Sequence, residues 1–279
     1  MSAIFYWVFR LLVLIVAGIF VFRYLDAEII FSAHGIYAVF LYFILSLISG
    51  VRYKNLVYYS SGQSISYFDV FRIPAAMNLA SYLFPVKGGG VWLFFYLKNR
   101  YGFSSKKSFL LAAFNLLFLG YLLVVFLLIF FSGFELRILG TLFLLGGYFL
   151  ILVLVKILLR ITLGYFLSWR FNIIDSFLVV FHFFILSWLC YILVGPISLE
   201  LSFFLALFLL VSAFIKITPG NIGVLEGGAV IAAQAIPHYG DTFLALAASY
   251  RSLSILHAIV AGAPSMLSLS LNWKGQGHY

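Results

Sequence analysis

Long apolar segments alternate with short polar ones along the 279 residues of the chain. A run such as 109–131 has the length and hydropathy of a helix that crosses a hydrocarbon layer about 30 Å thick. Polar or charged residues separate such runs, which predicts helices that cross a membrane in alternating directions. We expect about six full crossings, the last one kinked at Pro264, over residues 4–24, 29–50, 109–131, 137–155, 173–194 and 243–271.

Two other apolar stretches are each interrupted by residues that break helices. Residues 71–84 and 91–97 flank Pro85-Val86-Lys87-Gly88-Gly89-Gly90, and residues 199–215 and 225–235 flank a second break that contains Pro219 and Gly220. Proline lacks a backbone donor, and each apolar half is short for a crossing at about 1.5 Å per residue. The flanking charges make the first stretch enter from the cytoplasm and the second from outside. The sequence therefore predicts two broken or re-entrant helical hairpins, related as in an inverted repeat.

Composition places the chain in a membrane. Hydrophobic residues make up 65% of it and charged residues 9%, and the mean hydropathy is +1.16. A soluble domain cannot hide that much apolar surface. We therefore expect one all-α, polytopic integral membrane domain over residues 1–279. The first apolar segment is longer than a signal-peptide core and has no small-residue cleavage site, so we expect it to remain as a helix.

The formal net charge of +9 is explained by membrane topology and does not indicate nucleic-acid binding. Basic residues gather in loops or tails that can all face one side: Arg52, Lys54, Lys98, Arg100, Lys106, Lys107, Lys156, Arg160, Arg170 and Lys274. The opposite loops carry mostly acids: Asp26, Glu28, Glu135, Glu200 and Asp241. By the positive-inside rule the basic side is cytoplasmic, which places both termini there. We expect a multi-pass protein of the inner or plasma membrane.

Charged residues beside or inside apolar segments are the candidates for chemistry, because a charge at the bilayer centre costs about 2.5–3.5 kcal/mol on insertion scales. Glu226 follows the second break, and Arg251 lies inside the last crossing, where it can reach Glu226 or a lipid phosphate. Lys87 and Lys216 each lie beside a break and are candidates for holding an anionic head group, helped by the helix N-terminus that follows. Glu226 would hold these cations in place or exchange a proton. The alternatives are a purely structural salt bridge, and lysines that extend to the interface.

Packing explains the other notable residues. A small-residue face that permits close helix packing is formed by Gly223, Gly227, Gly228 and Ala232. His182 and His257 lie in expected crossings without partners at metal-ligand spacing, so we interpret them as hydrogen-bonded packing residues. Cys190 is the only cysteine, which excludes an intrachain disulfide and a cysteine metal cluster. We find no nucleophile–histidine–acid set, so the sequence predicts no enzyme, no catalytic residue, no metal and no cofactor.

The second break and its surroundings match a known pattern. The sequence Thr218-Pro219-Gly220-Asn221-Ile222-Gly223-Val224-Leu225-Glu226 resembles the Pro-Gly-Gly-x-Gly-x-x-Glu signature of the flippase-like family, which includes the transmembrane region of lysylphosphatidylglycerol synthases. Phe84-Pro85-Val86-Lys87-Gly88-Gly89 and the later Tyr101-Gly102-Phe103-Ser104 look like the family's Pro-x-basic-x-Gly segment and its Gly-x-Ser. Tyr250-Arg251 matches a Tyr-Arg pair in the final helix.

The resemblance implies a multi-pass protein that moves anionic or modified lipids, or lipid-linked intermediates, between leaflets. It carries substrate-binding roles over to Pro219, Gly220, Gly223, Glu226 and Arg251, and also to Pro85, Lys87 and Gly89. Asn221 stands where a second glycine is usual, Gly90 stands where an acid is frequent, and no Glu-Arg-x-x-Asp pattern occurs around residues 114–118. The aminoacyl-transfer domain of the synthases is absent from this sequence, so we do not expect it to make lysyl-lipid.

The functional hypothesis is a lipid-translocating protein whose partners are membrane lipids with anionic head groups. Two alternatives stay open. One is a proton-coupled secondary transporter of a small solute, driven through Glu226, and the other is a non-transporting membrane partner of an envelope-synthesis enzyme. Self-association into a homo-oligomer is also left open, and no nucleic acid is expected as a partner.

Overall fold

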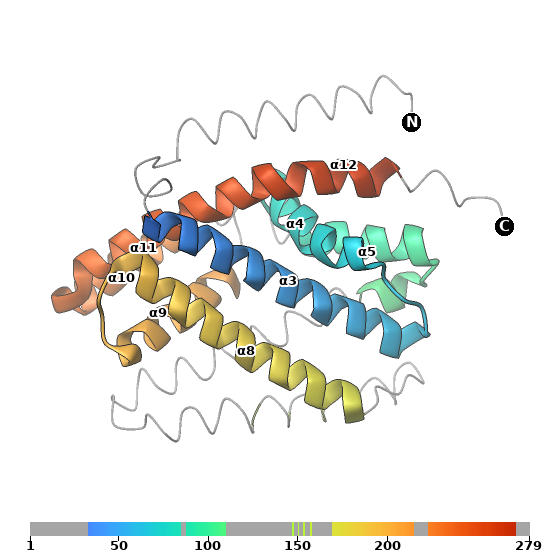
Figure 1. Ribbon diagram of the computed structural model, residues 1–279, viewed down its shortest axis with the longest axis horizontal. Coiled ribbons are helices and arrows are strands. Elements are labelled where there is room, and N and C mark those ends of the chain that lie inside the picture. The colour runs from blue at the N-terminus through green and yellow to red at the C-terminus, as the bar shows by residue number, and fades with distance from the viewer. Residues whose placement is uncertain are drawn as a thin grey trace.

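α-Helices account for the regular structure of the described chain, as the sequence predicts (Figure 1). The computed structural model describes residues 33–84, 88–109, 169–214 and 223–271, together with positions 147, 150, 153 and 157. Within these residues there is no β-strand. The all-α class is therefore confirmed, whereas the expected crossings over 4–24, 109–131 and 137–155 fall almost entirely outside the described residues.

In the described ranges, three helical segments are long and apolar enough to cross a membrane. They are His34–Tyr59, Ile173–Val194 and Pro237–Leu269, with mean hydropathies of 1.8, 2.5 and 1.5. Large apolar side chains remain exposed on the first two, which suits a surface in contact with lipid: Phe40, Phe177 and Trp188 are examples. These features agree with a membrane location.

Helices α3 (Ala33–Ser61) and α8 (Trp169–Val194) run side by side in opposite directions (Figure 1). α3 continues past the expected end at Gly50, because this glycine marks a helix crossing. A Cβ atom at Gly50 would lie 1.6 Å from the carbonyl oxygen of Val70, so glycine lets the backbones touch. Only residues 62–66 lie between α3 and the next helix.

Helices α4 (Tyr67–Leu83) and α5 (Gly88–Tyr101) are the two halves of the first predicted hairpin. The Asp69 amide donates to Ser66 Oγ at 3.2 Å, which caps the start of α4. α4 ends before Phe84, whose backbone is extended, as expected for a residue that precedes proline. The predicted break is too long at its far end, because residues 88–90 already form the first turn of α5.

Helices α9 (Leu199–Phe214) and α10 (Val224–Ala235) are the halves of the second predicted hairpin, and their bounds agree closely with the prediction. α8 stops ahead of them where Gly195 adopts φ +96° and Pro196 follows. The Leu201 amide then donates to Ser198 Oγ at 3.2 Å, which caps the start of α9. A short 3₁₀ turn, η3 (Pro237–Tyr239), leads from α10 into the last segment.

The last predicted crossing is one long helical segment that contains a wider turn. It consists of α11 (Gly240–His257), the π-turn η4 (Ala258–Gly262) and α12 (Ala263–Leu271). The Ala263 amide donates to the Ala258 carbonyl, five residues earlier. The irregularity predicted at Pro264 is present but begins before it, since proline offers no amide to the preceding turn.

Several helices converge on α4. It contacts α3, α5, η4 and α12, and its inner face carries Ala75, Ala76 and Ala80, which have no exposed surface. A Cβ atom at Gly262 would lie 2.6 Å from the Ala75 carbonyl oxygen, so the π-turn rests directly on α4. This packing brings polar residues of α3, α4 and α11 to one place.

Candidate functional site

Glu226 and Arg251, the two charged residues that the sequence singles out most clearly, are in direct contact. Arg251 donates from Nε to Oε1 of Glu226 at 2.7 Å and from Nη2 to Oε2 at 2.9 Å. This two-pronged geometry is the strong form of a guanidinium–carboxylate pair. The Arg251 side chain is 7% exposed and that of Glu226 is 43% exposed. The guanidinium is therefore buried, while the carboxylate can be reached from one side.

Gly223 holds the carboxylate in position. Its φ of +83° is a left-handed conformation that favours glycine, and its amide donates to Oε2 of Glu226 at 2.8 Å. Glu226 thus caps the start of α10 and at the same time binds Arg251 of α11. Of the other predicted residues of the two breaks, only Gly89 is described, whereas Pro85, Lys87, Lys216, Pro219 and Gly220 lie outside the described residues.

A polar network leads from the ion pair to the contact between α4 and α11. Arg251 also hydrogen-bonds Tyr82, and the Tyr82 hydroxyl donates to Ser254 Oγ at 2.9 Å. Asn78, one turn earlier in α4, donates from Nδ2 to the Ser254 carbonyl oxygen at 3.1 Å. Ser254 therefore connects the ion pair to the neighbourhood of Asn78, which lines a cavity.

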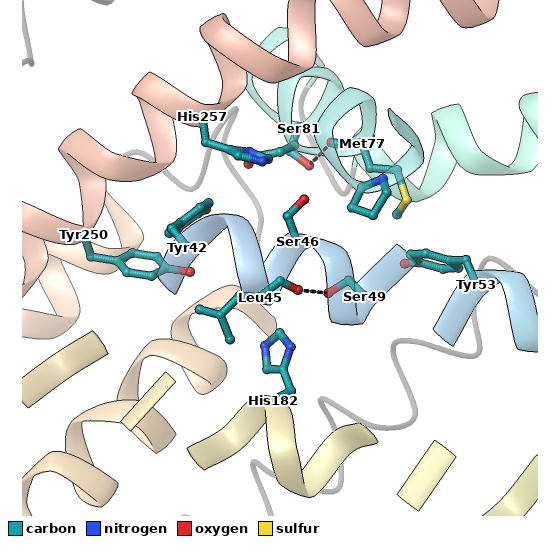
Figure 2. Close-up of a pocket in the computed structure, with 12 residues that line it drawn as sticks. Tyr42, Leu45, Ser46, Ser49, Tyr53, Met77, Ser81, His182, Tyr250 and His257 are labelled. Atoms are coloured by element: carbon teal, nitrogen blue, oxygen red, sulfur yellow. Dashed lines mark hydrogen bonds between the residues drawn. The ribbon is translucent and has the colours of Figure 1, made fainter. Parts of the chain in front are cut away.

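This cavity has a volume of about 210 Å³ and lies between α3, α4, α8 and α11 (Figure 2). Hydroxyl, amide, imidazole and phenol groups line it together with a few apolar side chains. Each of the three segments long enough to cross a membrane contributes to the wall, through Ser46, His182 and His257 respectively. Among the described residues no charged side chain lines it. A polar cavity among apolar helices is a typical site for a polar ligand group.

Asn78 fixes the protonation of His257, whose ring lines the cavity. The Nδ2 atom that donates to the Ser254 carbonyl also lies 3.2 Å from Nδ1 of His257. Because a carbonyl can only accept, the nearby Asn78 atom is the amide NH₂ group, and Nδ1 of His257 accepts its second hydrogen. The imidazole is then neutral, with its own proton on Nε2.

Three buried polar atoms on the cavity have no hydrogen-bond partner within the described part of the chain: Ser46 Oγ, His182 Nδ1 and His257 Nε2. The described residues therefore leave one ring nitrogen of His182 and one of His257 without a partner, which contradicts their interpretation as hydrogen-bonded packing residues. Sequence spacing could not reveal the cavity, because its walls come from distant segments. Asn78 and His257, for example, are 179 residues apart.

A smaller apolar cleft of about 70 Å³ adjoins the polar cavity. The two spaces share Tyr42 and His257. The remaining wall of the cleft is apolar and consists of Val39, Phe43, Leu253, Leu256 and Val260. A polar space and an apolar space therefore meet at two aromatic side chains.

The predicted glycines differ in what surrounds them. A Cβ atom at Gly89 would lie 2.6 Å from the Met77 carbonyl oxygen and 2.7 Å from Ser81 Oγ, so the structure gives this predicted substrate-binding residue a packing contact with α4. The predicted small-residue face is only partly confirmed. A Cβ atom at Gly228 would lie 3.4 Å from Phe208, whereas one at Gly227 would meet no described atom within 4 Å.

Gly89→Ala is expected to destabilise the protein by about 1–3 kcal/mol, because the Met77 carbonyl belongs to the backbone and cannot move aside. Gly90→Ala is the matched control, since the added Cβ would have no described atom within 4 Å and alanine favours a helix. Thermal unfolding of the purified protein in detergent measures the difference. Equal unfolding midpoints for the two variants would contradict the packing role of Gly89.

A second ion pair, with both side chains buried, joins α3 to α8. Arg52 donates from Nε to Oδ1 of Asp175 at 2.8 Å and from Nη2 to Oδ2 at 3.1 Å. Arg52 does not lie in a loop, as the sequence analysis expected, because α3 continues through it. Asp175 is not among the predicted site residues, although an acid inside an expected crossing is the same kind of signal as Glu226.

Metal chemistry has no support in the described ranges, where no group of His, Cys, Asp and Glu side chains could hold an ion. No family model matches the chain, and no curated protein or solved structure matches it either. The resemblance to the flippase-like family therefore stays a prediction from short motifs.

Proposed function

We propose that this protein moves lipids between the two leaflets of the inner or plasma membrane, with anionic or modified lipids, or lipid-linked intermediates, as the substrate class. The observation that carries the proposal is the polar cavity, which adjoins an apolar cleft and is lined by three helical segments long enough to cross a membrane. A lipid has the same two parts, a polar head group and apolar chains. The cavity would shelter the uncharged part of the head group while the chains stay in hydrocarbon.

The cavity would lower the main barrier to lipid movement. Burying a polar group without hydrogen-bond partners costs about 2–7 kcal/mol, and burying a charge costs more. Side chains such as Ser46, Asn78 and His257 offer hydrogen-bond partners to a head group, although the helices that carry them are mostly apolar. Since about 1.4 kcal/mol corresponds to a factor of ten in rate, even part of this compensation accelerates crossing strongly.

Arg251 and Glu226 would act beside this cavity. Arg251 is held by Glu226 in this conformation, so exchange of the carboxylate for a lipid phosphate would loosen α10 from α11. Lys87 and Lys216, beside the two breaks, would attract the phosphate, and the broken helices would serve as hinges. The topology that we propose has about six crossings and two re-entrant hairpins, with both termini in the cytoplasm.

A proton-coupled transporter of a small solute is the second candidate, and one observation favours it. The Glu226 carboxylate is 43% exposed although its partner Arg251 is buried. A proton arriving from the exposed side would neutralise the carboxylate and release the guanidinium. The ion pair would then open and close with proton binding.

Lipid flux in proteoliposomes tests the proposal and separates the two candidates. The vesicles contain phosphatidylglycerol with a fluorescent label, and added dithionite bleaches only the label in the outer leaflet. The protein should raise the bleached fraction above that of protein-free vesicles, and the flux should persist after an ionophore has collapsed the proton gradient. Bleaching no greater than in protein-free vesicles for every lipid tested would refute lipid movement. Flux that the ionophore abolishes would favour proton coupling.

A further inference from the structure

We propose that the cavity between α3, α4, α8 and α11 binds an uncharged, polyhydroxylated head-group unit, such as a single sugar ring. The inference deepens the proposed function and rests on it for the lipid nature of the ligand. The chemistry of the ligand follows from three properties of the cavity: its lack of charge, its unused hydrogen-bonding groups and its size (Figure 2).

The cavity offers no countercharge to an anion. Its lining contains no Asp, Glu, Lys or Arg among the residues that the structure describes. Arg251 on α11 is held by Glu226, and Arg52 on α3 is held by Asp175. A phosphate in the cavity would lose its water without gaining a partner charge, which is costly away from solvent. An uncharged head group avoids this cost.

Unused hydrogen-bonding groups are present on this cavity. Ser46 and His257 are 7% and 4% exposed, and Ser46 Oγ, His257 Nε2 and His182 Nδ1 lack a partner in the described chain. Figure 2 shows the Ser46 side chain directed from α3 toward Ser81 and His257. Buried polar groups are nearly always hydrogen-bonded, so these atoms indicate a ligand that bonds to them.

Ser46 differs from the other serines of the cavity. Ser49 donates to the Leu45 carbonyl at 3.0 Å and Ser81 donates to the Met77 carbonyl at 2.9 Å, as serines inside helices often do. Within the described chain Ser46 makes no such bond, so its hydroxyl can both donate and accept. The neutral His257 ring adds a donor at Nε2. The hydroxyl groups of a sugar match this set, because each of them can donate and accept.

The size of the cavity corresponds to one ring. A cavity of about 150 Å³ holds a benzene molecule, so 210 Å³ leaves room for a six-membered ring with its hydroxyl groups. Sites for whole drug-sized ligands measure about 300–1,000 Å³, so the lipid chains must lie elsewhere. The adjoining cleft has an apolar wall, so the chains would lie on that side of the cavity. Tyr42 and His257, with ring centroids 5.1 Å apart, line both spaces and stand at their junction.

Native mass spectrometry of the full chain with two probe lipids tests the inference. The probes are monoglucosyl diacylglycerol and phosphatidic acid with the same acyl chains, and the protein should retain the glucolipid in preference. Ser46→Ala should weaken glucolipid binding about fivefold, the factor expected for one lost neutral hydrogen bond. Ser46→Leu, which fills the cavity, should abolish it. Ser187→Ala on α8 is the matched control and should bind like the wild type, because Ser187 does not line the cavity and its hydroxyl is bonded to its own helix.

Preference for phosphatidic acid, or unchanged glucolipid binding by a folded Ser46→Leu variant, would overturn the inference. Either result leaves the proposed function standing if labelled phosphatidylglycerol still moves in proteoliposomes. Specific glucolipid binding without flux of any lipid would instead overturn lipid movement and keep the binding site. Thermal unfolding in detergent shows whether Ser46→Leu is folded. If it is not, the comparison of Ser46→Ala with Ser187→Ala decides the question.

Discussion

Glu226→Gln is expected to remove most lipid flux while the protein still inserts into the membrane. Oε1 of Glu226 accepts from Nε of Arg251, and Oε2 accepts from both Nη2 of Arg251 and the Gly223 amide. In either orientation of a glutamine, its NH₂ group would face at least one of these donors. The buried guanidinium would also lose its countercharge. A hydrogen bond to a charged group contributes about 1.5–3 kcal/mol, so flux that depends on this pair should fall about 10- to 100-fold.

The proteoliposome assay measures this effect, and the yield and elution profile of the purified variant report on insertion. Glu200→Gln is the matched control, because it makes the same change at an exposed residue in the first turn of α9. Arg251→Lys should give an intermediate flux, since lysine keeps the charge but lacks the two-pronged geometry. Normal flux by Glu226→Gln would exclude the ion pair from the mechanism.

Asp175→Asn is expected to lower folding stability by about 3–5 kcal/mol, the usual effect of breaking a buried ion pair. The Arg52 side chain is 10% exposed and that of Asp175 is 1% exposed, so water cannot replace the lost carboxylate. The pair joins two of the three segments long enough to cross a membrane, α3 and α8. A lower unfolding midpoint in detergent and a lower yield of inserted protein should both result.

Replacing both partners tests whether the loss comes from an unpaired charge. Arg52→Met combined with Asp175→Leu removes both charges and should be more stable than Asp175→Asn alone. The pair of Asp69 and Arg72 provides a control, because its atoms are 3.8 Å apart and the Arg72 side chain is 37% exposed. Arg72→Met should therefore cost less than about 1 kcal/mol. A double variant less stable than Asp175→Asn would show that the pair contributes a net attraction.

Helix positions in this protein follow largely from apolar runs and helix breakers. The bounds of α9 and α10 agree with the sequence because proline and glycine act on the backbone locally. The helix ends predicted at Gly50 and Gly88 are wrong, because a glycine at a helix crossing looks the same in a sequence as one at a helix end. Contacts with α4 keep both glycines inside helices. The spacing of residues in the sequence does not show which segments make such contacts.

The candidate site is only partly predictable for a related reason. Glu226 and Arg251 stand out as charges near or inside apolar segments, and the cost of leaving either alone favours their pairing. Ser46 and His182 are single polar residues in apolar helices. Nothing local distinguishes a side chain on a cavity from one that faces lipid, so the cavity emerges only when the helices are packed.

The π-turn at residues 258–262 has a consequence for how the C-terminal part of the chain tolerates changes in length. Each residue of an α-helix advances the helical phase by about 100°, so the wider turn sets which face of α12 meets α4. Deleting one residue there would rotate Leu269 out of the core, while Arg251 and His257, which precede the turn, would keep their phase. Insertions and deletions in the π-turn can therefore change how α12 packs on α4 while the polar residues of α11 keep their orientation.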